Sequence, residues 1–183
     1  LLCVAAVTPA KGLDVLVAAL AQVAGLSWGC LCVGSLDRDP AFVDRLRLEI
    51  AHAGIADRIR FAGVRTGADL DAAYAAADVV VVTSRSETYG MVVTEALARA
   101  IPVIAAAVGG LPEALGYGAD QVRPGILVPP GDPTAVADAL GRWLGDPDLR
   151  LRLRRAAHQR RCGLSSWATT AGQLARVLRT AGV

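Results

Sequence analysis

The chain alternates from end to end between short apolar runs and longer amphipathic runs, and this alternation is the feature that most constrains its fold. The apolar runs are strand-sized, rich in Val and Ile, and lack the polar alternation of a half-exposed strand. They fall at residues 1–7, 28–34, 58–63, 78–84, 102–106 and 125–130. Such runs are typical of a parallel sheet that is covered by helices on both faces.

Helix-like runs separate the apolar ones. One begins at Lys11 and another after Gly90, and the others span 40–54, 68–77, 109–115, 132–145, 147–160 and 165–180. Regular alternation of strands and helices requires right-handed crossovers. We therefore predict one α/β domain over residues 1–183. It is a Rossmann-like, doubly wound parallel sheet of about six strands, with helices on both faces and a helical C-terminal tail.

The composition argues against several function classes. The chain has 183 residues, 54% of them hydrophobic, enough to bury the core of one domain. The formal net charge of +2 is too small to indicate nucleic acid or a membrane as the main partner. No apolar run could span a bilayer, and residues 1–7 lack the basic lead-in of a signal peptide. We expect a cytoplasmic chain, and its start without Met indicates a fragment or a processed chain.

The cysteines offer a weak metal motif. Cys30 and Cys32 are two residues apart in a predicted strand, so both side chains face the same side of the sheet. No second Cys or His pair has a suitable spacing. We therefore interpret them as buried, reduced thiols and expect no metal.

Ligands of doubly wound sheets bind beyond the carboxyl ends of the strands, so the segments that follow the strands are the candidate site. These segments are 8–12, 34–37, 63–67, 84–91 and 107–113. The first of them, "TPAKG", has a single glycine, and the chain has no G-x-x-x-x-G-K-[ST] motif. The glycine-rich dinucleotide turn and the Walker loop are therefore both absent from the sequence.

A different phosphate site remains. Lys11 and Gly12 open one helix and Gly90 and Met91 open another, so two helix N-termini and one cation would face a diphosphate. A carboxylate one turn into the second helix, at Glu95, can accept hydrogen bonds from a ribose diol. Glu87, on the preceding turn, would face another part of the ligand. The alternative is that both acids only favour the helix dipole or are solvated.

The segment "SRSETYGMVVTEALARAIPVIAAAVGGLPE" (84–113) resembles the donor-binding signature of the retaining glycosyltransferases of family 4, with its Glu-x7-Glu motif. Four further segments are similar to that family in order and spacing: "KGLDVLVAAL", "RIRFAGV", "LDAAYAAADVVVVTS" and "GILVPPGDPTAVADAL". The "SW" at 166–167 resembles the start of the family's closing helix. The resemblance covers nearly the whole chain.

The resemblance implies the C-terminal, donor-binding half of the two-domain GT-B fold. The N-terminal domain, which binds the acceptor and usually supplies a catalytic-site histidine, would lie outside this chain. The expected partners are a nucleotide-sugar donor and that missing domain, with no nucleic acid. The expected enzyme is a bacterial hexosyltransferase that is inactive as this isolated domain.

The resemblance also implies roles for individual residues. Glu87 matches the catalytic-site glutamate near the transferred sugar, and Glu95 matches the glutamate that holds the ribose. Lys11 matches the lysine on the donor diphosphate. The sugar- and phosphate-contacting loop corresponds to Thr88, Tyr89, Gly90 and Met91, and the base-contacting loop to Val64 and Arg65. Transfer would be a front-face reaction in which the leaving diphosphate helps to deprotonate the acceptor, with no metal or other cofactor required.

One position departs from the family. Its members usually carry an arginine five residues before the lysine, and here that position is Ala6. A missing cation beside the leaving diphosphate would weaken transition-state stabilisation. Arg65, Arg85 or the missing domain would have to compensate; otherwise the chain is a degenerate, non-catalytic binding module. A sugar-nucleotide epimerase is a further alternative, which the Glu-x7-Glu spacing disfavours.

A basic segment at 149–161 has two interpretations. It could hold the full-length enzyme at the inner face of the membrane, as a peripheral contact with anionic lipid. Alternatively it is a solvated helix face, with Asp146 and Asp148 favouring the helix dipole at its start. We favour the solvated face.

Overall fold

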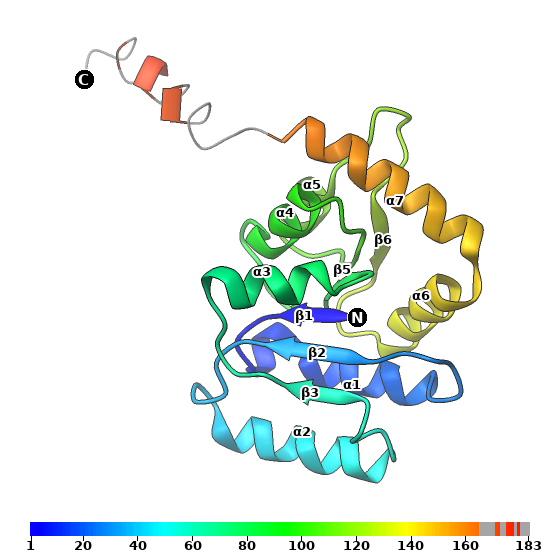
Figure 1. Ribbon diagram of the computed structural model, residues 1–183. Helices are drawn as coiled ribbons and strands as arrows, with labels where there is room; N and C mark the ends of the chain where they lie inside the picture. Colours follow the sequence, from blue (N-terminus) through cyan, green and yellow to red (C-terminus); the bar gives the residue numbers. More distant parts are fainter. Residues whose placement is uncertain (165–170, 173–174, 178, 180–183) are drawn as a thin grey trace.

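The computed structural model describes residues 1–164, 171–172, 175–177 and 179. Its six strands form one sheet in the order β3-β2-β1-β4-β5-β6, and every neighbouring pair is parallel. The strands are β1 (Leu2–Val4), β2 (Cys30–Val33), β3 (Ile59–Phe61), β4 (Val80–Val82), β5 (Val103–Ala106) and β6 (Gly125–Val128). The predicted six-stranded, doubly wound parallel sheet is confirmed (Figure 1).

Helices connect the strands. They are the 3-10 helix η1 (Pro9–Lys11), α1 (Leu13–Gln22), α2 (Pro40–His52), α3 (Gly67–Ala75), α4 (Met91–Ala98), α5 (Leu111–Leu115), α6 (Pro133–Gly145) and α7 (Pro147–Cys162). Aspartates at the N-caps of α2, α6 and α7 accept hydrogen bonds from backbone N–H groups of the first turn, and a proline follows each of them. These local signals explain why the starts of the three helices could be predicted from the sequence.

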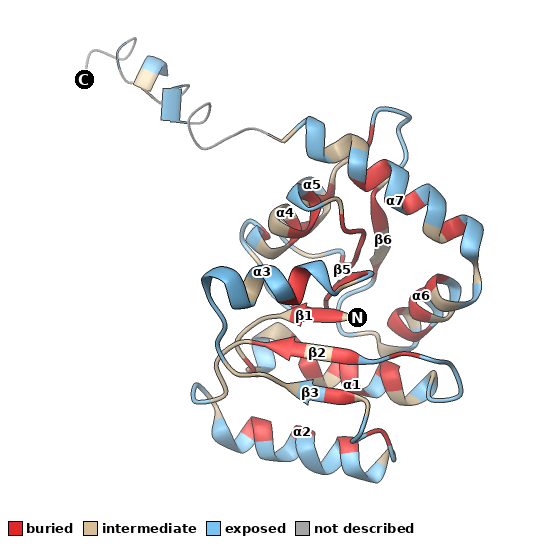
Figure 2. Ribbon diagram, in the orientation of Figure 1, coloured by how far each residue is buried: buried red, intermediate tan, exposed pale blue. Residues whose placement is uncertain are grey.

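The alternation of side chains along the strands divides the core between the two faces of the sheet. Cys3, Val81 and Ile104 point to one face and pack with α1, α2 and α6. Leu2, Val80 and Val103 point to the other face and pack with α3, α4 and α5. Figure 2 shows buried residues along the strands and on the inner sides of the helices. Both faces are therefore covered, as the unbroken apolar strands predict.

The strands are shorter than the apolar runs that predict them. The run 1–7 contains β1 only at Leu2–Val4. Beyond the strand, the Ala5 N–H still donates to the carbonyl of Val33 at the end of β2, at 2.8 Å, and the Val7 N–H donates to the carbonyl of Ser35 in the following loop, at 2.9 Å. The remaining apolar residues thus form the loop that leads to the crevice at the sheet edge.

The basic segment lies within α7, where two of its arginines make contacts with other elements. Arg150 donates to the carbonyls of Trp143 and Leu144 at the C-terminus of α6, and Arg154 forms an ion pair with Asp78 at 2.6 Å. None of the described helices is long and apolar enough to cross a membrane. The predicted closing helix at 165–180, with Trp167, falls mostly outside the described residues.

The cysteine pair is buried as expected. Cys30 and Cys32 lie on one face with their sulfurs 4.0 Å apart, and Cys3 is opposite Cys32 on the neighbouring strand. All three are free thiols in the core. In the part of the chain that the structure describes, no group of three or more His, Cys, Asp or Glu side chains could hold a metal ion.

Candidate functional site

The candidate site lies where the sheet reverses its direction of winding. From β1 the chain proceeds to β2 on one side, and from β4 to β5 on the other side, so the loops after β1 and β4 diverge. A crevice forms at such a switch point beyond the carboxyl ends of the strands. We call the space between residues 5–12 and 83–90 the switch-point crevice.

Two predicted site residues meet in this crevice. Lys11 ends η1 and Glu87 lies on the loop before α4, and Lys11 Nζ donates to Glu87 Oε2 at 2.7 Å. Their side chains are 32% and 20% exposed, so the pair is accessible to a ligand. A cavity of about 20 Å³ lies beneath them, between the ends of β1 and β4. The structure thus brings together a cation and a carboxylate that are 76 positions apart.

The first loop is fixed against the second by backbone contact. Gly12 has a φ of 64°, and a Cβ at this position would lie 2.1 Å from the carbonyl oxygen of Thr83. The Thr83 hydroxyl donates to the Gly12 carbonyl at 2.8 Å. Only glycine fits here, so Lys11 is positioned by the backbone of the β4 loop. Nothing in the sequence pattern indicated this role of Thr83.

The loop after β5 holds Glu87 from the other side. Gly109 has a φ of 53°, and a Cβ there would lie 1.6 Å from the Glu87 carbonyl oxygen. The N–H of Gly110 donates to the same oxygen at 3.2 Å. The two adjacent glycines therefore allow the β5 loop to close on the β4 loop. In the sequence this pair opens the run 109–115, which is predicted as a short helix and is separated by two residues from the preceding predicted strand.

Arg85 ties the two crevice loops together. Its guanidinium contacts both carboxylate oxygens of Asp14, at 2.8 and 2.6 Å, and the Pro9 carbonyl at 2.7 Å. The hydrogen bond from Arg85 is the main cause that lowers the pKa of Asp14, and the same bond raises the pKa of Arg85. Arg65 forms a longer ion pair with Asp69, at 3.5 Å. Both arginines named as substitutes for the cation missing at Ala6 thus have carboxylate partners.

Glu95 lies on α4 and is held by a residue that the sequence reasoning missed. The hydroxyl of Tyr74, from α3, donates to Glu95 Oε2 at 2.8 Å. Burial of Tyr74, and next its hydrogen bond to Glu95, raise the pKa of the tyrosine well above its usual range. The phenol therefore stays protonated and keeps its role as donor.

The other predicted residues lie after β4 or after β3, and all of them except the buried Gly90 are exposed. Gly90 is the N-cap of α4 with a φ of 89°, and Thr88, Tyr89 and Met91 beside it are exposed. Val64 is 65% exposed in the loop between β3 and α3. This loop, with Arg65, follows the edge strand β3, two strands from β1. The structure therefore separates the Val64–Arg65 loop from the Lys11–Glu87 pair along the same edge of the sheet.

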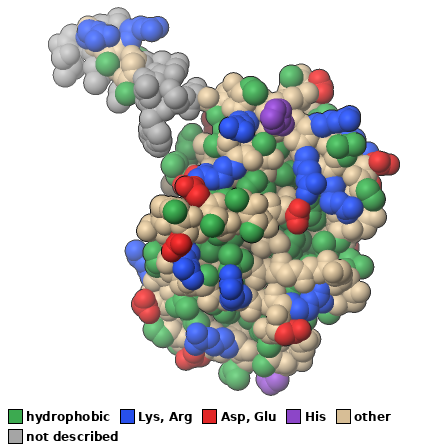
Figure 3. Space-filling model, in the orientation of Figure 1, with side chains coloured by type: hydrophobic (Ala, Val, Ile, Leu, Met, Phe, Trp, Pro, Cys, Tyr) green, Lys and Arg blue, Asp and Glu red, His purple; other side chains and the backbone are tan. Residues whose placement is uncertain are grey.

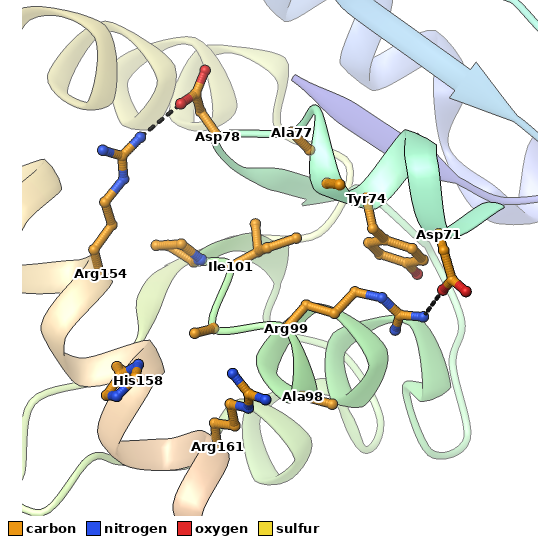
Figure 4. Close-up of a pocket in the computed structure, with 13 residues that line it drawn as sticks. Asp71, Tyr74, Ala77, Asp78, Ala98, Arg99, Ile101, Arg154, His158 and Arg161 are labelled. Carbon is orange, nitrogen blue, oxygen red and sulfur yellow. Dashed lines mark hydrogen bonds and ion pairs between the residues drawn. The ribbon is translucent and has the colours of Figure 1, made fainter. Parts of the chain in front are cut away.

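A larger cavity lies elsewhere, with a volume of about 710 Å³. Its walls include Ala77 and Asp78, just before β4, and Ile101 and Pro102, just before β5, so it opens at the amino ends of the strands. Figure 4 shows Arg99, Arg154, His158 and Arg161 around it. Basic and acidic side chains are interspersed on the face seen in Figure 3. This cavity is not the switch-point crevice.

The fold and the crevice define a doubly wound α/β domain with a cation, an acid and a helix N-terminus at the switch point of its sheet. Residues 1–160 match the family described as "Glycosyl transferases group 1", and the chain belongs to this family. The family resemblance inferred from the motifs is confirmed.

Related proteins agree with this assignment. The chain is 36% identical over 187 residues to the D-inositol 3-phosphate glycosyltransferase of Salinispora arenicola, a match that covers 92% of this chain and 38% of the relative. It is 48% identical over 128 residues to the protein of the same name from Salinispora tropica, over 69% of this chain and 26% of the relative. The chain thus spans less than half the length of these relatives.

Solved structures show the same fold. Anabaena HepE in complex with UDP matches with a TM-score of 0.85 and 28% identity, over 98% of this chain and 48% of that protein. Sucrose-phosphate synthase from Thermosynechococcus elongatus matches with a TM-score of 0.81 and 35% identity, over 98% of this chain and 46% of that protein.

Proposed function

We propose that this chain binds a nucleotide-diphosphate sugar and that, together with an acceptor-binding domain outside it, it transfers the glycosyl group with retention of the anomeric configuration. The observation that carries the proposal is the meeting of Lys11 and Glu87 at the switch point, beside the N-terminus of α4. A cation and a helix N-terminus are the groups that a diphosphate requires. The Glu87 carboxylate would accept hydrogen bonds from hydroxyl groups of the sugar.

The roles follow from this arrangement. Lys11 exchanges part of its contact with Glu87 for the donor diphosphate, and Glu87 is then released to the transferred sugar. The loop from Thr88 to Met91 contributes backbone N–H groups to the sugar and phosphate. Glu95 accepts hydrogen bonds from the ribose, and Val64 and Arg65 contact the base.

The main catalytic term of this mechanism is electrostatic. Cleavage of the bond between sugar and phosphate leaves negative charge on the diphosphate, and preorganised donors at the crevice stabilise that charge. The departing diphosphate takes the proton of the acceptor hydroxyl on the same face of the sugar, which retains the configuration. No metal and no further cofactor takes part in this proposal.

The names of similar proteins suggest which compounds to test first. Anabaena HepE has been crystallised with UDP-glucose, which makes UDP the first nucleotide to try. The Salinispora relatives are named for D-inositol 3-phosphate, which makes this compound the first acceptor to try with the full-length protein.

Calorimetry with UDP, GDP and ADP tests the proposal. We expect this chain to bind one of them weakly and to transfer no sugar, because the acceptor domain is outside it. Glu95→Ala should weaken binding about tenfold, since a charge-assisted hydrogen bond contributes about 1.5 kcal/mol or more. Glu49→Ala, an exposed acid on α2, is the matched control and should bind as the wild type does. Absence of binding to all three nucleotides would refute the proposal.

A degenerate, non-catalytic binding module is the second candidate, and Ala6 favours it together with the engagement of Arg85 by Asp14. Substitution Ala6→Arg in the full-length protein separates the two. A large gain in turnover indicates a degenerate site. Unchanged turnover above background indicates that another group already supplies the charge.

A further inference from the structure

Among the residues that the structure describes, the hydroxyl of Tyr74 has one hydrogen-bond partner, and that partner is the acid proposed to bind ribose. Tyr74 is fully buried between α3 and α4 and donates to Glu95 Oε2 at 2.8 Å. Within the described residues, Glu95 Oε1 accepts no hydrogen bond from the protein. One oxygen of the carboxylate is therefore anchored and the other is available to a ligand.

Arg99 secures the tyrosine ring from its other side. The guanidinium lies 4.5 Å from the ring centre, donates to the Glu95 carbonyl at 3.1 Å and forms an ion pair with Asp71 of α3. Figure 4 shows the Arg99 side chain alongside Tyr74 with its contact to Asp71. These contacts join α3 to α4 around one carboxylate, and we call Asp71, Tyr74, Glu95 and Arg99 the α3–α4 clamp.

The anchor changes what Glu95 can do. A free glutamate side chain rotates about three bonds, and fixing it on a ligand costs conformational entropy. A hydrogen bond that is already made before the ligand arrives lowers this cost, because the carboxylate is held in one orientation. The hydroxyl of Tyr74 contributes this bond from a buried position, where the donor itself has little freedom.

We propose that Tyr74 is a positioning residue: its hydroxyl orients the Glu95 carboxylate to accept hydrogen bonds from the vicinal hydroxyls of a ribose. The inference rests on the proposed function, since it assumes that Glu95 contacts the ribose. It also connects two parts of the site. Helix α3, which carries Tyr74, begins directly after the Val64–Arg65 loop proposed to contact the base. The same helix therefore serves the base and, through Glu95, the sugar of the nucleoside.

A purely structural tyrosine would behave differently from a positioning one. If Tyr74 only packs the core, its loss weakens every ligand to the same extent. If it orients Glu95, its loss matters only for ligands with ribose hydroxyls. Comparing a ribonucleotide with its 2′,3′-dideoxy analogue therefore separates the two roles.

The experiment is calorimetry on this chain with the best-binding nucleoside diphosphate among UDP, GDP and ADP and with its 2′,3′-dideoxy analogue. Tyr74→Phe keeps the ring beneath Arg99 and removes only the hydroxyl. We expect about three- to tenfold weaker binding of the ribonucleotide, the scale of one hydrogen bond, and less than a twofold change for the dideoxy analogue. Tyr117→Phe is the matched control, because Arg123 both stacks on Tyr117 and donates to its hydroxyl, outside the crevice. It should change neither affinity.

The inference is overturned if Tyr74→Phe weakens the binding of both ligands equally. It is also overturned if Tyr74→Phe leaves ribonucleotide binding unchanged while Glu95→Ala abolishes the preference for ribose. A wild-type chain with no preference for ribose, or with no binding, overturns the proposed role of Glu95 and this inference together. Thermal unfolding checks that each variant is folded. If Tyr74→Phe does not fold, Arg99→Ala decides: a loss confined to the ribonucleotide supports the inference, and an equal or absent loss contradicts it.

Discussion

The two edges of the sheet are built in opposite ways. At the carboxyl edge, the crevice around Lys11 and Glu87 holds a cavity of only about 20 Å³. Its loops touch backbone to backbone through Gly12 and Gly109. At the amino edge, a cavity of about 710 Å³ is bordered by long side chains in partly exposed ion pairs.

The candidate site therefore lies at the edge with the smaller cavity, and its geometry is set by backbone contacts rather than by an open volume. Backbone contacts at the carboxyl edge cannot relax without moving a strand end, so they position the side chains that they carry. At the amino edge, the exposed Arg154–Asp78 ion pair contributes only about 0–1 kcal/mol. The edge with the backbone contacts is also the one where the sequence motifs converge.

The largest effect on stability is expected where a substitution adds a methyl group to Gly109 at the carboxyl edge. Gly109→Ala would place its Cβ on the Glu87 carbonyl oxygen and would also be strained at a φ of 53°. We expect a loss of about 3 kcal/mol in the free energy of unfolding, from overpacking and backbone strain together. Urea unfolding measures it.

The control for this substitution is Gly131→Ala. Gly131 has a φ of 73°, but nothing lies within 4 Å of the added Cβ, so we expect a loss of about 1 kcal/mol. If the two substitutions cost the same free energy of unfolding, the tight contact between the β4 and β5 loops adds nothing to the cost of Gly109→Ala.

A smaller effect, on binding rather than stability, is expected from Lys11→Ala. Removal of the cation should weaken binding of a nucleoside diphosphate about tenfold, or about 1.4 kcal/mol. The corresponding change at the amino edge, Arg154→Ala, should leave the affinity unchanged. Calorimetry on both variants tests the comparison directly, and similar losses would mean that the two edges do not differ in function.

The smallest effect is the contribution of the Arg85–Asp14 ion pair to the free energy of unfolding, which depends on pH. In the unfolded chain Asp14 has the ordinary pKa of an aspartate, about 3.9. Folding lowers the pKa of Asp14 below that value, mainly through the hydrogen bond from Arg85. The pair therefore stabilises the fold above about pH 4, and this stability is lost as the pH falls through the lower, folded pKa.

Asp14→Asn should accordingly cost about 1 kcal/mol at pH 7, with the difference from the wild type shrinking below about pH 4. Urea unfolding between pH 7 and pH 3 follows this difference. Asp78→Asn, which removes the partner of Arg154, should cost less than about 0.5 kcal/mol at pH 7. A constant cost of Asp14→Asn at all pH values would contradict the electrostatic account.

Much of the fold could be predicted from local patterns. The apolar runs specified the strands because residues buried on both faces need no polar alternation. Asp39, Asp132 and Asp146, each followed by proline, marked three helix starts. The ends of the strands could not be predicted, because the apolar residues beyond β1 pack in a loop rather than in the ladder.

The sequence indicated candidate site residues but not the contacts that they make. Glu87, Gly90 and Glu95 could be identified because they lie close together on a strand-to-helix turn. Tyr74 could not, since an aromatic residue on a helix face is typical of core packing. Its hydroxyl meets Glu95 only because α3 and α4 lie on the same face of the sheet.

The sequence by itself determined the elements, their parallel arrangement and the family, since hydrophobic period, caps and motif spacing are local properties. Only the tertiary structure decided which distant groups meet. It paired Lys11 with Glu87, engaged Arg85 with Asp14 and anchored Glu95 on Tyr74. The physical reason is that a hydrogen bond or ion pair depends on distances of a few ångströms, and those distances are set by how helices and loops pack across the sheet.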